Sequence, residues 1–304
     1  MRFPRFSALI ASFLLTTSPA MAEVPRIVAD TPIAHSLTAQ VMGDLAMPVL
    51  LLEQGSDPHH AQLRPSQVRA LSRADLVIWT SGDLSPWLVE VITSIAPDKS
   101  MELAAVGGLH HQNFQESALL EHEEEDEHDH EGRDPHLWLN TENAQVWVDA
   151  IAERLQILDP ENSAIYAQNA ARTRAEITRV SQEVAGILVP ASGAGLVMSH
   201  DAFGYFATGF DLTILGSVAA GDAVSPGAAR IAALRAALVD AGAVCIFPEV
   251  NHPDAYISLV ADGSDLRRGR ALDPAGVMVQ PGPELYAEVL LGQARSIADC
   301  VAGD

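Results

Sequence analysis

Residues 159–188 read DPENSAIYAQNAARTRAEITRVSQEVAGIL, and this stretch predicts the element around which the fold is organised. Apolar side chains such as Ile177 and Val184 recur at near-helical spacing, and no glycine or proline interrupts the stretch between its second residue and its last turn. Asp159 is suited to cap the N-terminus of a helix, and Pro160 fits the first helical position. The sequence therefore predicts one long rigid helix, which would act as a stiff connection between two parts of the chain.

Short strand-like runs alternate with helical patterns on both sides of this helix. Three runs precede it and three follow it, at residues 26–30, 48–53 and 75–80, and at residues 195–199, 243–249 and 267–273. Such alternation is typical of βαβ units with parallel strands. The predicted fold class is α/β: two Rossmann-like α/β lobes with parallel sheets, joined by the long rigid helix, with a metal in the cleft between the lobes.

The first 22 residues have the pattern of a signal peptide. Arg2 and Arg5 precede an apolar run at residues 8–15, and the small residues Ala20 and Ala22 mark a cleavage site. The run is shorter than the roughly 20 apolar residues that span a bilayer, so we expect export to the periplasm. The expected organisation is a signal peptide at 1–22, an N-terminal α/β lobe at 23–140, a helical connection at 141–189 and a C-terminal α/β lobe at 190–304.

The chain is strongly acidic, with 40 Asp and Glu against 18 Lys and Arg and a formal net charge of −22. A charge of this sign argues against nucleic acids and anionic membrane surfaces as partners, because both are themselves negative. It is compatible with a protein that attracts cations. We expect a monomer.

Four candidate metal ligands stand where predicted strands end, namely His59, His136, His200 and Asp273. In open α/β sheets, ligands bind at the carboxyl ends of the strands, so two facing lobes would bring the four side chains to one cleft. Three imidazoles and one carboxylate suit Zn²⁺, whereas Mg²⁺ and Ca²⁺ prefer oxygen ligands, and manganese is the second choice. Four protein ligands leave no open position, which favours holding a metal over using it in catalysis.

Other side chains compete for the role of ligand. Glu249 and His252, in FPEVNHPD, form a rival pair that we interpret as rim or supporting residues. His35, in the first predicted helix, we interpret as a structural or rim residue. A single histidine after a strand is more often a hydrogen-bonded cap than a ligand, but Asp-Pro-His occurs twice, at residues 57–59 and 134–136, and this repetition favours ligation.

Five motifs stand in the order and approximate spacing of a known family: PHHAQLRPSQVRALSRADLVIW, DPHLWL, MSHDAFGYFA, IFPE and LDPAG. On these motifs the chain resembles the zinc-binding solute-binding proteins of ABC transporters, the ZnuA-type or cluster A-I group with its AztC-like branch. The resemblance covers essentially the whole mature chain. It implies two α/β lobes joined by one long helix, and it implies that the metal ligands are His59, His136, His200 and Asp273.

The resemblance also indicates which histidine of the first motif is the ligand and which metal is bound. The family's first ligand lies six residues before the proline that matches Pro65, which selects His59 over its neighbour His60. Manganese-type relatives tend to carry glutamate at the position of His200, so the resemblance implies zinc. The implied function is a periplasmic protein that captures Zn²⁺ as a transported ligand and delivers it to the permease of an ABC importer in the inner membrane, with a periplasmic zinc chaperone as a further candidate partner.

An acidic, histidine-rich segment at residues 110–134 interrupts the alternation of strands and helices and predicts a flexible loop. One interpretation is a solvated charge run. The other is a weak collector of zinc that raises the local metal concentration near the cleft. The candidate weak auxiliary sites are His60, His110, His111, His122, His128 and His130.

The chain has two cysteines, Cys245 and Cys300. An even number in an oxidising compartment predicts one disulfide, and the alternative is two buried free thiols.

Three other functions compete with zinc import. A manganese-binding homologue and a metal buffer without an importer are both compatible with the ligand set. A secreted zinc hydrolase is disfavoured because the sequence has neither an HExxH nor a GxSxG motif and because the coordination shell would be filled. We therefore expect that the protein is not an enzyme.

Overall fold

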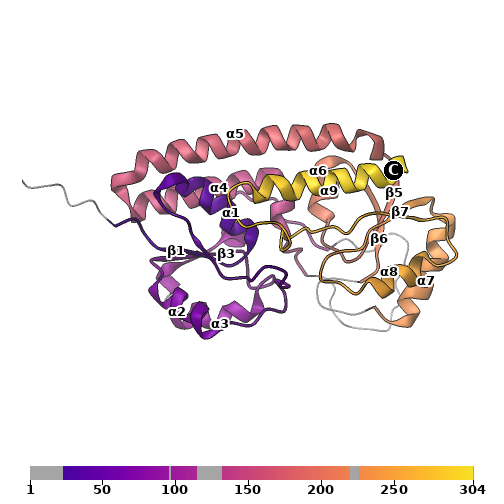
Figure 1. Ribbon diagram of the computed structural model, residues 1–304, viewed down its shortest axis with the longest axis horizontal. Helices are drawn as coiled ribbons and strands as arrows, with labels where there is room; N and C mark the ends of the chain where they lie inside the picture. The colour runs from indigo at the N-terminus through magenta and orange to yellow at the C-terminus, as the bar shows by residue number, and fades with distance from the viewer. Residues whose placement is uncertain (1–22, 96, 115–131, 220–225, 304) are drawn as a thin grey trace, which may run out of the picture.

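Two α/β lobes lie side by side beneath a layer of long helices in the computed structural model (Figure 1). The structure describes residues 23–95, 97–114, 132–219 and 226–303. The segment predicted as a signal peptide and most of the acidic loop lie outside the described residues. The arrangement confirms the predicted α/β class with two lobes and a long helix.

The first sheet has four parallel strands in the order β2-β1-β3-β4. Its strands are β1 (Ile27–Ala29), β2 (Val49–Leu50), β3 (Leu76–Trp79) and β4 (Ser100–Glu102). The connecting helices are α1 (Pro32–Met42), α2 (Pro65–Arg73) and α3 (Pro86–Ile95). Because side chains alternate along a strand, Ile27 and Ala29 enter the main core while Val28 packs on the other face with Leu71 of α2 and Leu88 of α3. Both faces of the sheet are therefore covered.

The second sheet repeats this design with the strand order β6-β5-β7-β8, again parallel. Its strands are β5 (Gly195–Met198), β6 (Thr213–Ser217), β7 (Ala243–Ile246) and β8 (Arg267–Arg268). Its helices are α6 (Gly204–Phe210), α7 (Ala228–Asp240) and α8 (Asp254–Ala261). In β5, Leu196 and Met198 enter the main core while Val197 packs on the opposite face with Leu234 of α7 and Ile257 of α8.

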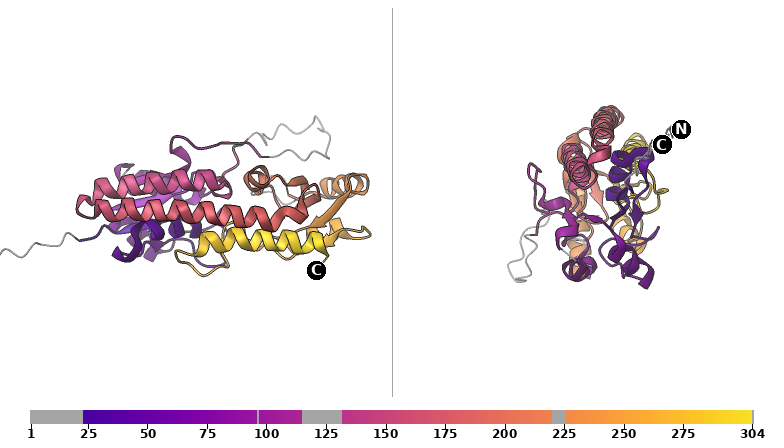
Figure 2. Two further views of the ribbon diagram at one scale, coloured as in Figure 1. Left: turned by 90° about the horizontal axis from the view of Figure 1, so that it is seen from above. Right: turned by 90° about the vertical axis from the view of Figure 1, so that its left-hand side faces the viewer.

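The helical layer consists of α4 (Thr141–Leu158), α5 (Ser163–Leu188) and α9 (Leu285–Ala302). These three helices run nearly parallel to one another (Figure 2). The 26 residues of α5 extend about 39 Å at 1.5 Å per residue. Its buried stripe, which includes Tyr166, Ile177 and Val184, joins a single core that contains strands of both sheets. A continuous core therefore connects the two lobes along α5, which is the single long helix that the sequence predicts.

The start of the long helix differs from the prediction. Pro160 begins a 3₁₀ turn, η5 (Pro160–Asn162), and α5 begins only at Ser163. Asp159 instead ends α4, and its Oδ2 accepts hydrogen bonds of 2.8 Å from both Asn162 Nδ2 and Tyr166 Oη. The carboxylate therefore closes the turn between two antiparallel helices rather than capping a single long one.

The C-terminal part of the chain crosses between the lobes. After β8 it returns to the first lobe, where the Gly55 amide donates to the Val277 carbonyl and the Ser36 hydroxyl donates to the Pro283 carbonyl, both at 2.9 Å. Helix α9 then runs back along α5. Cys300 at its end forms a disulfide with Cys245 of β7, with 6.3 Å between their Cα atoms, which confirms the predicted pairing.

Within the described part of the chain, no helix is both long enough and apolar enough to cross a membrane.

Candidate metal site

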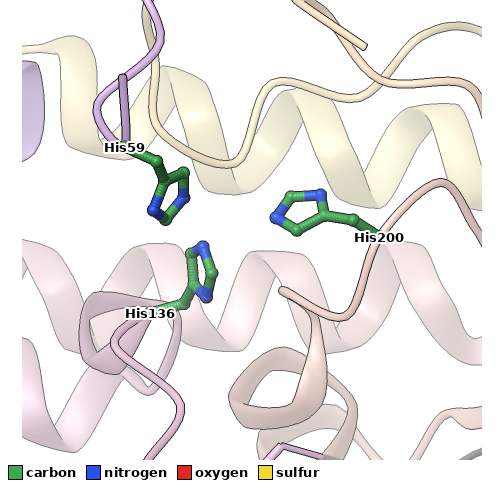
Figure 3. A group of neighbouring side chains, drawn as sticks. All are labelled: His59, His136 and His200. Carbon is green, nitrogen blue, oxygen red and sulfur yellow. The ribbon is translucent and has the colours of Figure 1, made fainter. Parts of the chain in front are cut away.

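Three histidines from separate segments meet at the junction of the two lobes. His59 comes from the loop between β2 and α2, His136 directly precedes the turn η4 (Leu137–Leu139), and His200 follows β5. The rings point toward a common centre (Figure 3), and one ring nitrogen of each lies within 4.8 Å of those of the others. Ring centroids are 5.4 Å apart for His136 and His200, 5.6 Å for His59 and His136, and 6.3 Å for His59 and His200.

The two Asp-Pro-His segments form the same local turn. The His59 amide donates to Asp57 Oδ1 at 2.8 Å, and the His136 amide donates to Asp134 Oδ1 at 2.9 Å. In such a turn the aspartate binds the backbone two residues further on and fixes the direction in which the histidine leaves the chain. The repeated motif therefore presents two imidazoles from distant parts of the sequence in a preset direction.

Asp134 also fixes the ring of His136. Its Oδ1 lies 2.8 Å from His136 Nδ1, so Nδ1 is engaged and Nε2 is the nitrogen directed at the other histidines. Asp134 is itself buried, and burial raises the pKa of its carboxyl to about 7. The carboxyl accepts a further hydrogen bond of 3.2 Å from Gln112 Nε2. A carboxylate behind a histidine in this way fixes the tautomer and orientation of a metal-ligating ring.

His200 has an equivalent carboxylate in Glu249, whose Oε2 lies 2.5 Å from His200 Nδ1. His200 follows β5 and Glu249 follows β7, which is the adjacent parallel strand. Strands β6 and β7 pair with β5 on opposite sides, so the order of the strands reverses at β5. Such a switch point is where open α/β sheets bind ligands. His200 and Glu249 therefore lie where the topology of the second lobe favours the binding of a ligand.

The surroundings keep two of the three imidazoles neutral, those of His59 and His136. Burial, followed by the nearby His136 and His200, lowers the pKa of His59 to about 2. Burial also lowers the pKa of His136 well below its usual value. A neutral imidazole has a nitrogen lone pair available for a metal, whereas a protonated ring must first release its proton. His59 and His136 can thus bind a divalent cation near neutral pH without first releasing a proton.

Asp273, the fourth predicted ligand, lies outside both groups of potential metal donors found among the described residues. Its two carboxylate oxygens accept hydrogen bonds from the amides of Val277 at 2.9 Å and Met278 at 2.8 Å. Burial raises the pKa of its carboxyl. Because each carboxylate oxygen has a second lone pair, these hydrogen bonds do not prevent ligation.

Among the described residues, the candidates for weak auxiliary metal sites belong to neither group of potential metal donors. His60 is exposed, with Nδ1 2.8 Å from Asp57 Oδ2, and the exposed His110 has Nε2 3.1 Å from Glu142 Oε2. His111 lines a cavity of about 160 Å³ together with Arg133 and Asp134. The remaining candidates lie outside the described residues, namely His122, His128 and His130.

His35 is buried in α1, where its Nε2 lies 3.0 Å from the Pro48 carbonyl oxygen. It belongs to neither donor group of the described residues, which agrees with its structural interpretation.

Local sequence patterns do not assign the supporting carboxylates to particular histidines. Asp134 is signalled by its place two residues before His136, a spacing that the Asp57 and His59 pair repeats. Glu249 was interpreted as a rim or supporting residue, and the structure places it directly on His200. No local pattern pairs Glu249 with His200, because 49 residues separate them and only strand pairing brings them together.

The structure thus combines two α/β lobes, a layer of long helices and three imidazoles that converge where the lobes meet, as in a protein that binds a metal ion between two lobes. Residues 27–300 match the family described as the periplasmic component A of the zinc-uptake complex, ZnuA. The chain belongs to this family.

Individual relatives agree with this membership. The chain is 42% identical to the high-affinity zinc uptake system protein ZnuA of Paracoccus denitrificans (strain Pd 1222) over 327 aligned positions, covering 99% of each chain. A crystal structure of ZnuA superimposes with a TM-score of 0.75 at 21% identity, covering 91% of this chain and 99% of the other. The Mn²⁺ complex of the binding protein FpvC from Pseudomonas aeruginosa superimposes with a TM-score of 0.77 at 18% identity, covering 92% and 99%. At these identities the two structures show the fold alone.

Proposed function

We propose that this protein captures Zn²⁺ in the periplasm with His59, His136 and His200, with Asp273 as the fourth ligand, and delivers the ion to the permease of an ABC importer in the inner membrane. The observation that carries the proposal is the convergence of three imidazoles, each with a ring nitrogen within 4.8 Å of the others. Membership of the zinc-uptake family supports the same cargo.

The donor set favours zinc over manganese. Three imidazole nitrogens suit a borderline-soft ion, whereas Mn²⁺ prefers carboxylate and carbonyl oxygens. FpvC, a neighbour of the same fold, forms a complex with Mn²⁺, so the side chains rather than the fold must select the metal. We keep a manganese-binding role as the second candidate because Asp273 would add one oxygen ligand.

The geometry supports holding an ion rather than catalysing a reaction with it. Catalytic zinc sites keep a position for water, whereas Asp273 would close the shell here. The family is one of transport components, which supports the same conclusion.

Export by the segment at residues 1–22, action as a monomer and loading by a periplasmic zinc chaperone are parts of the same proposal. The family description as periplasmic supports the location. The acidic segment would add weak sites that collect zinc, and the exposed His60 and His110 are further candidates for such sites.

Metal competition tests the proposal. Untagged protein should bind Zn²⁺ tightly in the presence of a competing chelator, and an excess of Mn²⁺ should not displace it. In cells that lack the protein and grow on scarce zinc, the wild-type gene should restore growth and the His136→Ala gene should not. Preference for Mn²⁺ in the competition, or full rescue by His136→Ala, would overturn the assignment.

Asp273 needs a test of its own. Asp273→Asn retains one amide oxygen that can accept a hydrogen bond from the Val277 amide, but it removes the anionic ligand. We expect markedly weaker zinc binding and only a slightly lower unfolding temperature of the zinc-free protein, because the amide nitrogen of the variant cannot accept the hydrogen bond from the Met278 amide. Unchanged affinity would assign Asp273 to the local turn alone.

A further inference from the structure

A second group of metal donors adjoins the three-histidine cluster and shares one residue with it. His200, Glu249 and His252 each offer a ligand atom, and these atoms lie within 4.8 Å of one another. His252 lies in the turn between β7 and α8, which closes with a 3.3 Å hydrogen bond from its amide to the Glu249 carbonyl. The intervening Asn251 has a φ of 68°, a left-handed conformation that asparagine tolerates better than most residues. The turn thus holds the two side chains together.

The carboxylate of Glu249 faces both imidazoles. Its Oε2 lies 2.5 Å from His200 Nδ1, and its Oε1 lies 3.9 Å from His252 Nε2. The rings of His200 and His252 stack with centroids 4.5 Å apart and an interplanar angle of 21°. Two imidazoles and a glutamate form a donor set that holds Zn²⁺ in many proteins while leaving a position for water.

The three side chains differ in their exposure to solvent. The exposed fraction of the side chain is 2% for His200, 6% for Glu249 and 19% for His252. A hydrated ion can therefore reach His252 before it reaches His200, or His136, whose side chain is also only 2% exposed. The order of exposure matches a path from solvent to the buried site.

We propose that His252, Glu249 and His200 form an entry site, which holds Zn²⁺ transiently and passes it to the site of His59, His136 and His200. The proposal rests on the proposed zinc-capture function and adds a route to it. With Zn²⁺ in the entry site, Glu249 is a metal ligand. In that state Nδ1 of His200 holds the ion and Nε2 carries the ring proton; when the ion moves to Nε2, the displaced proton returns to Nδ1, where Glu249 accepts it in the hydrogen bond that the structure shows.

This exchange lowers the cost of transfer because His200 and Glu249 take part in both states. One ligand bond can be replaced at a time, so the ion need not regain its full hydration shell between the two sites. Release to an importer would follow the same steps in reverse. A residue that serves only as an intermediate ligand should affect the rates of binding and release more than their ratio.

Stopped-flow kinetics test the route. His252→Ala should slow both zinc association and chelator-driven release by about tenfold, which corresponds to raising the barrier by about 1.4 kcal/mol. The dissociation constant should change less than either rate. Asp254→Asn is the matched control, because Asp254 lies two residues away and pairs with Arg268 on the surface. Wild-type rates in His252→Ala, or a change in only one of the two rates that appears in full in the dissociation constant, would overturn the proposal.

A site-specific binding measurement separates an entry site from a packing role of His252. In a His59→Ala/His136→Ala variant, the three proposed entry ligands remain. Titration with Zn²⁺ should then shift the ring ¹H–¹⁵N NMR signals of His252 and His200 in a saturable manner, with weaker affinity than the wild type. Signals that do not respond would refute the entry site. Tight binding retained by this variant would instead refute the proposed function, so the two failures are distinguishable.

If the double variant does not fold, His59→Ala is titrated alone and only the ring signal of His252 is followed, because His252 belongs to the proposed entry site and not to the three-histidine cluster. His59 lies in a surface loop between β2 and α2 and contributes to none of the three core clusters.

Discussion

Nδ1 of His200 lies 2.5 Å from Oε2 of Glu249, and this contact joins the ends of two neighbouring parallel strands. It leaves Nε2 of His200 as the nitrogen that faces His59 and His136. Asp134 sets the ring of His136 in the same way, with 2.8 Å between Oδ1 and Nδ1. Two of the three imidazoles therefore have their orientation fixed by a buried carboxylate before any metal arrives, which lowers the cost of ordering the site on binding.

The first prediction compares adjacent histidines. His59→Ala should weaken tight zinc binding by more than about 100-fold, beyond the 10–100-fold loss typical of a supporting residue. His60→Ala should have a much smaller effect, because His60 is exposed and bonded to Asp57. Zinc titration against a competing chelator measures both. The reverse order would place the first ligand at His60.

The second prediction concerns the supporting carboxylates. Glu249→Gln and Asp134→Asn keep a hydrogen-bond acceptor beside the ring nitrogen but remove its negative charge. Zinc affinity should fall by about 10–100-fold in each, because a carboxylate raises the basicity of the ligating imidazole. Isothermal titration with a competing chelator gives the affinity, and unfolding of the zinc-free variants controls for misfolding. Wild-type affinity in both would show that the carboxylates do not support the ligands.

The third prediction links pH to stability through Asp30, which is fully buried at the end of β1. Its carboxylate accepts hydrogen bonds from the Thr31 amide at 2.7 Å and the Thr80 amide at 2.9 Å. Burial nevertheless raises its pKa to about 6. A carboxyl whose pKa is higher in the folded than in the unfolded protein contributes stability that is fully present below the unfolded pKa near 4 and is lost as pH rises through 6.

Asp30→Asn removes this dependence and provides the comparison. Between pH 7.5 and pH 4, the free energy of unfolding of the wild type should rise relative to that of the variant by about 3 kcal/mol, from two pKa units at about 1.4 kcal/mol each. Urea unfolding at a series of pH values measures the difference in unfolding free energy between the wild type and the variant. The contributions of all other titrating groups cancel in this difference. A difference that stays constant with pH would refute the raised pKa.

The fourth prediction concerns the disulfide between Cys245 of β7 and Cys300 of α9, which closes a loop with a sequence separation of 55. The chain-entropy relation gives about 4 kcal/mol of stabilisation for a loop of this length. The Cys245→Ala/Cys300→Ala variant should lose about this much in urea unfolding. Thiol titration of unfolded, unreduced wild-type protein should find no free thiol, and finding two would contradict the pairing.

The fifth prediction separates capture from storage by replacing residues 115–131 with a short glycine linker. The flanking residues are close, because the Phe114 amide donates to the Gly132 carbonyl at 3.3 Å, so a short linker can join them. The affinity of the tight site should stay nearly unchanged, since none of its proposed ligands is removed, while the number of weakly bound zinc ions should fall. A large loss of tight-site affinity would mean that the replaced segment contributes a ligand.

Much of the architecture could be predicted from local patterns. Short apolar runs predicted the parallel strands because each is buried on both faces, as Ile27 and Val28 illustrate with their opposite cores. The periodic apolar stripe of α5 predicted the long helix because the spacing of residues such as Ile177 and Val184 places them on one face. The start of that helix could not be predicted, because the Tyr166 hydroxyl reaches back to Asp159 and stabilises a 3₁₀ turn instead.

The sequence by itself determined which imidazoles were candidates, because Asp-Pro-His turns and strand ends are local features that short motifs encode. Only the tertiary structure decided how their rings are oriented and what lies beside them. Glu249 reaches His200 across 49 residues of sequence, and Asp273 is bonded to the amides of Val277 and Met278 rather than grouped with the three histidines. The physical reason is that the direction of a ring nitrogen depends on hydrogen bonds of a few ångströms between segments that meet only after both sheets have formed.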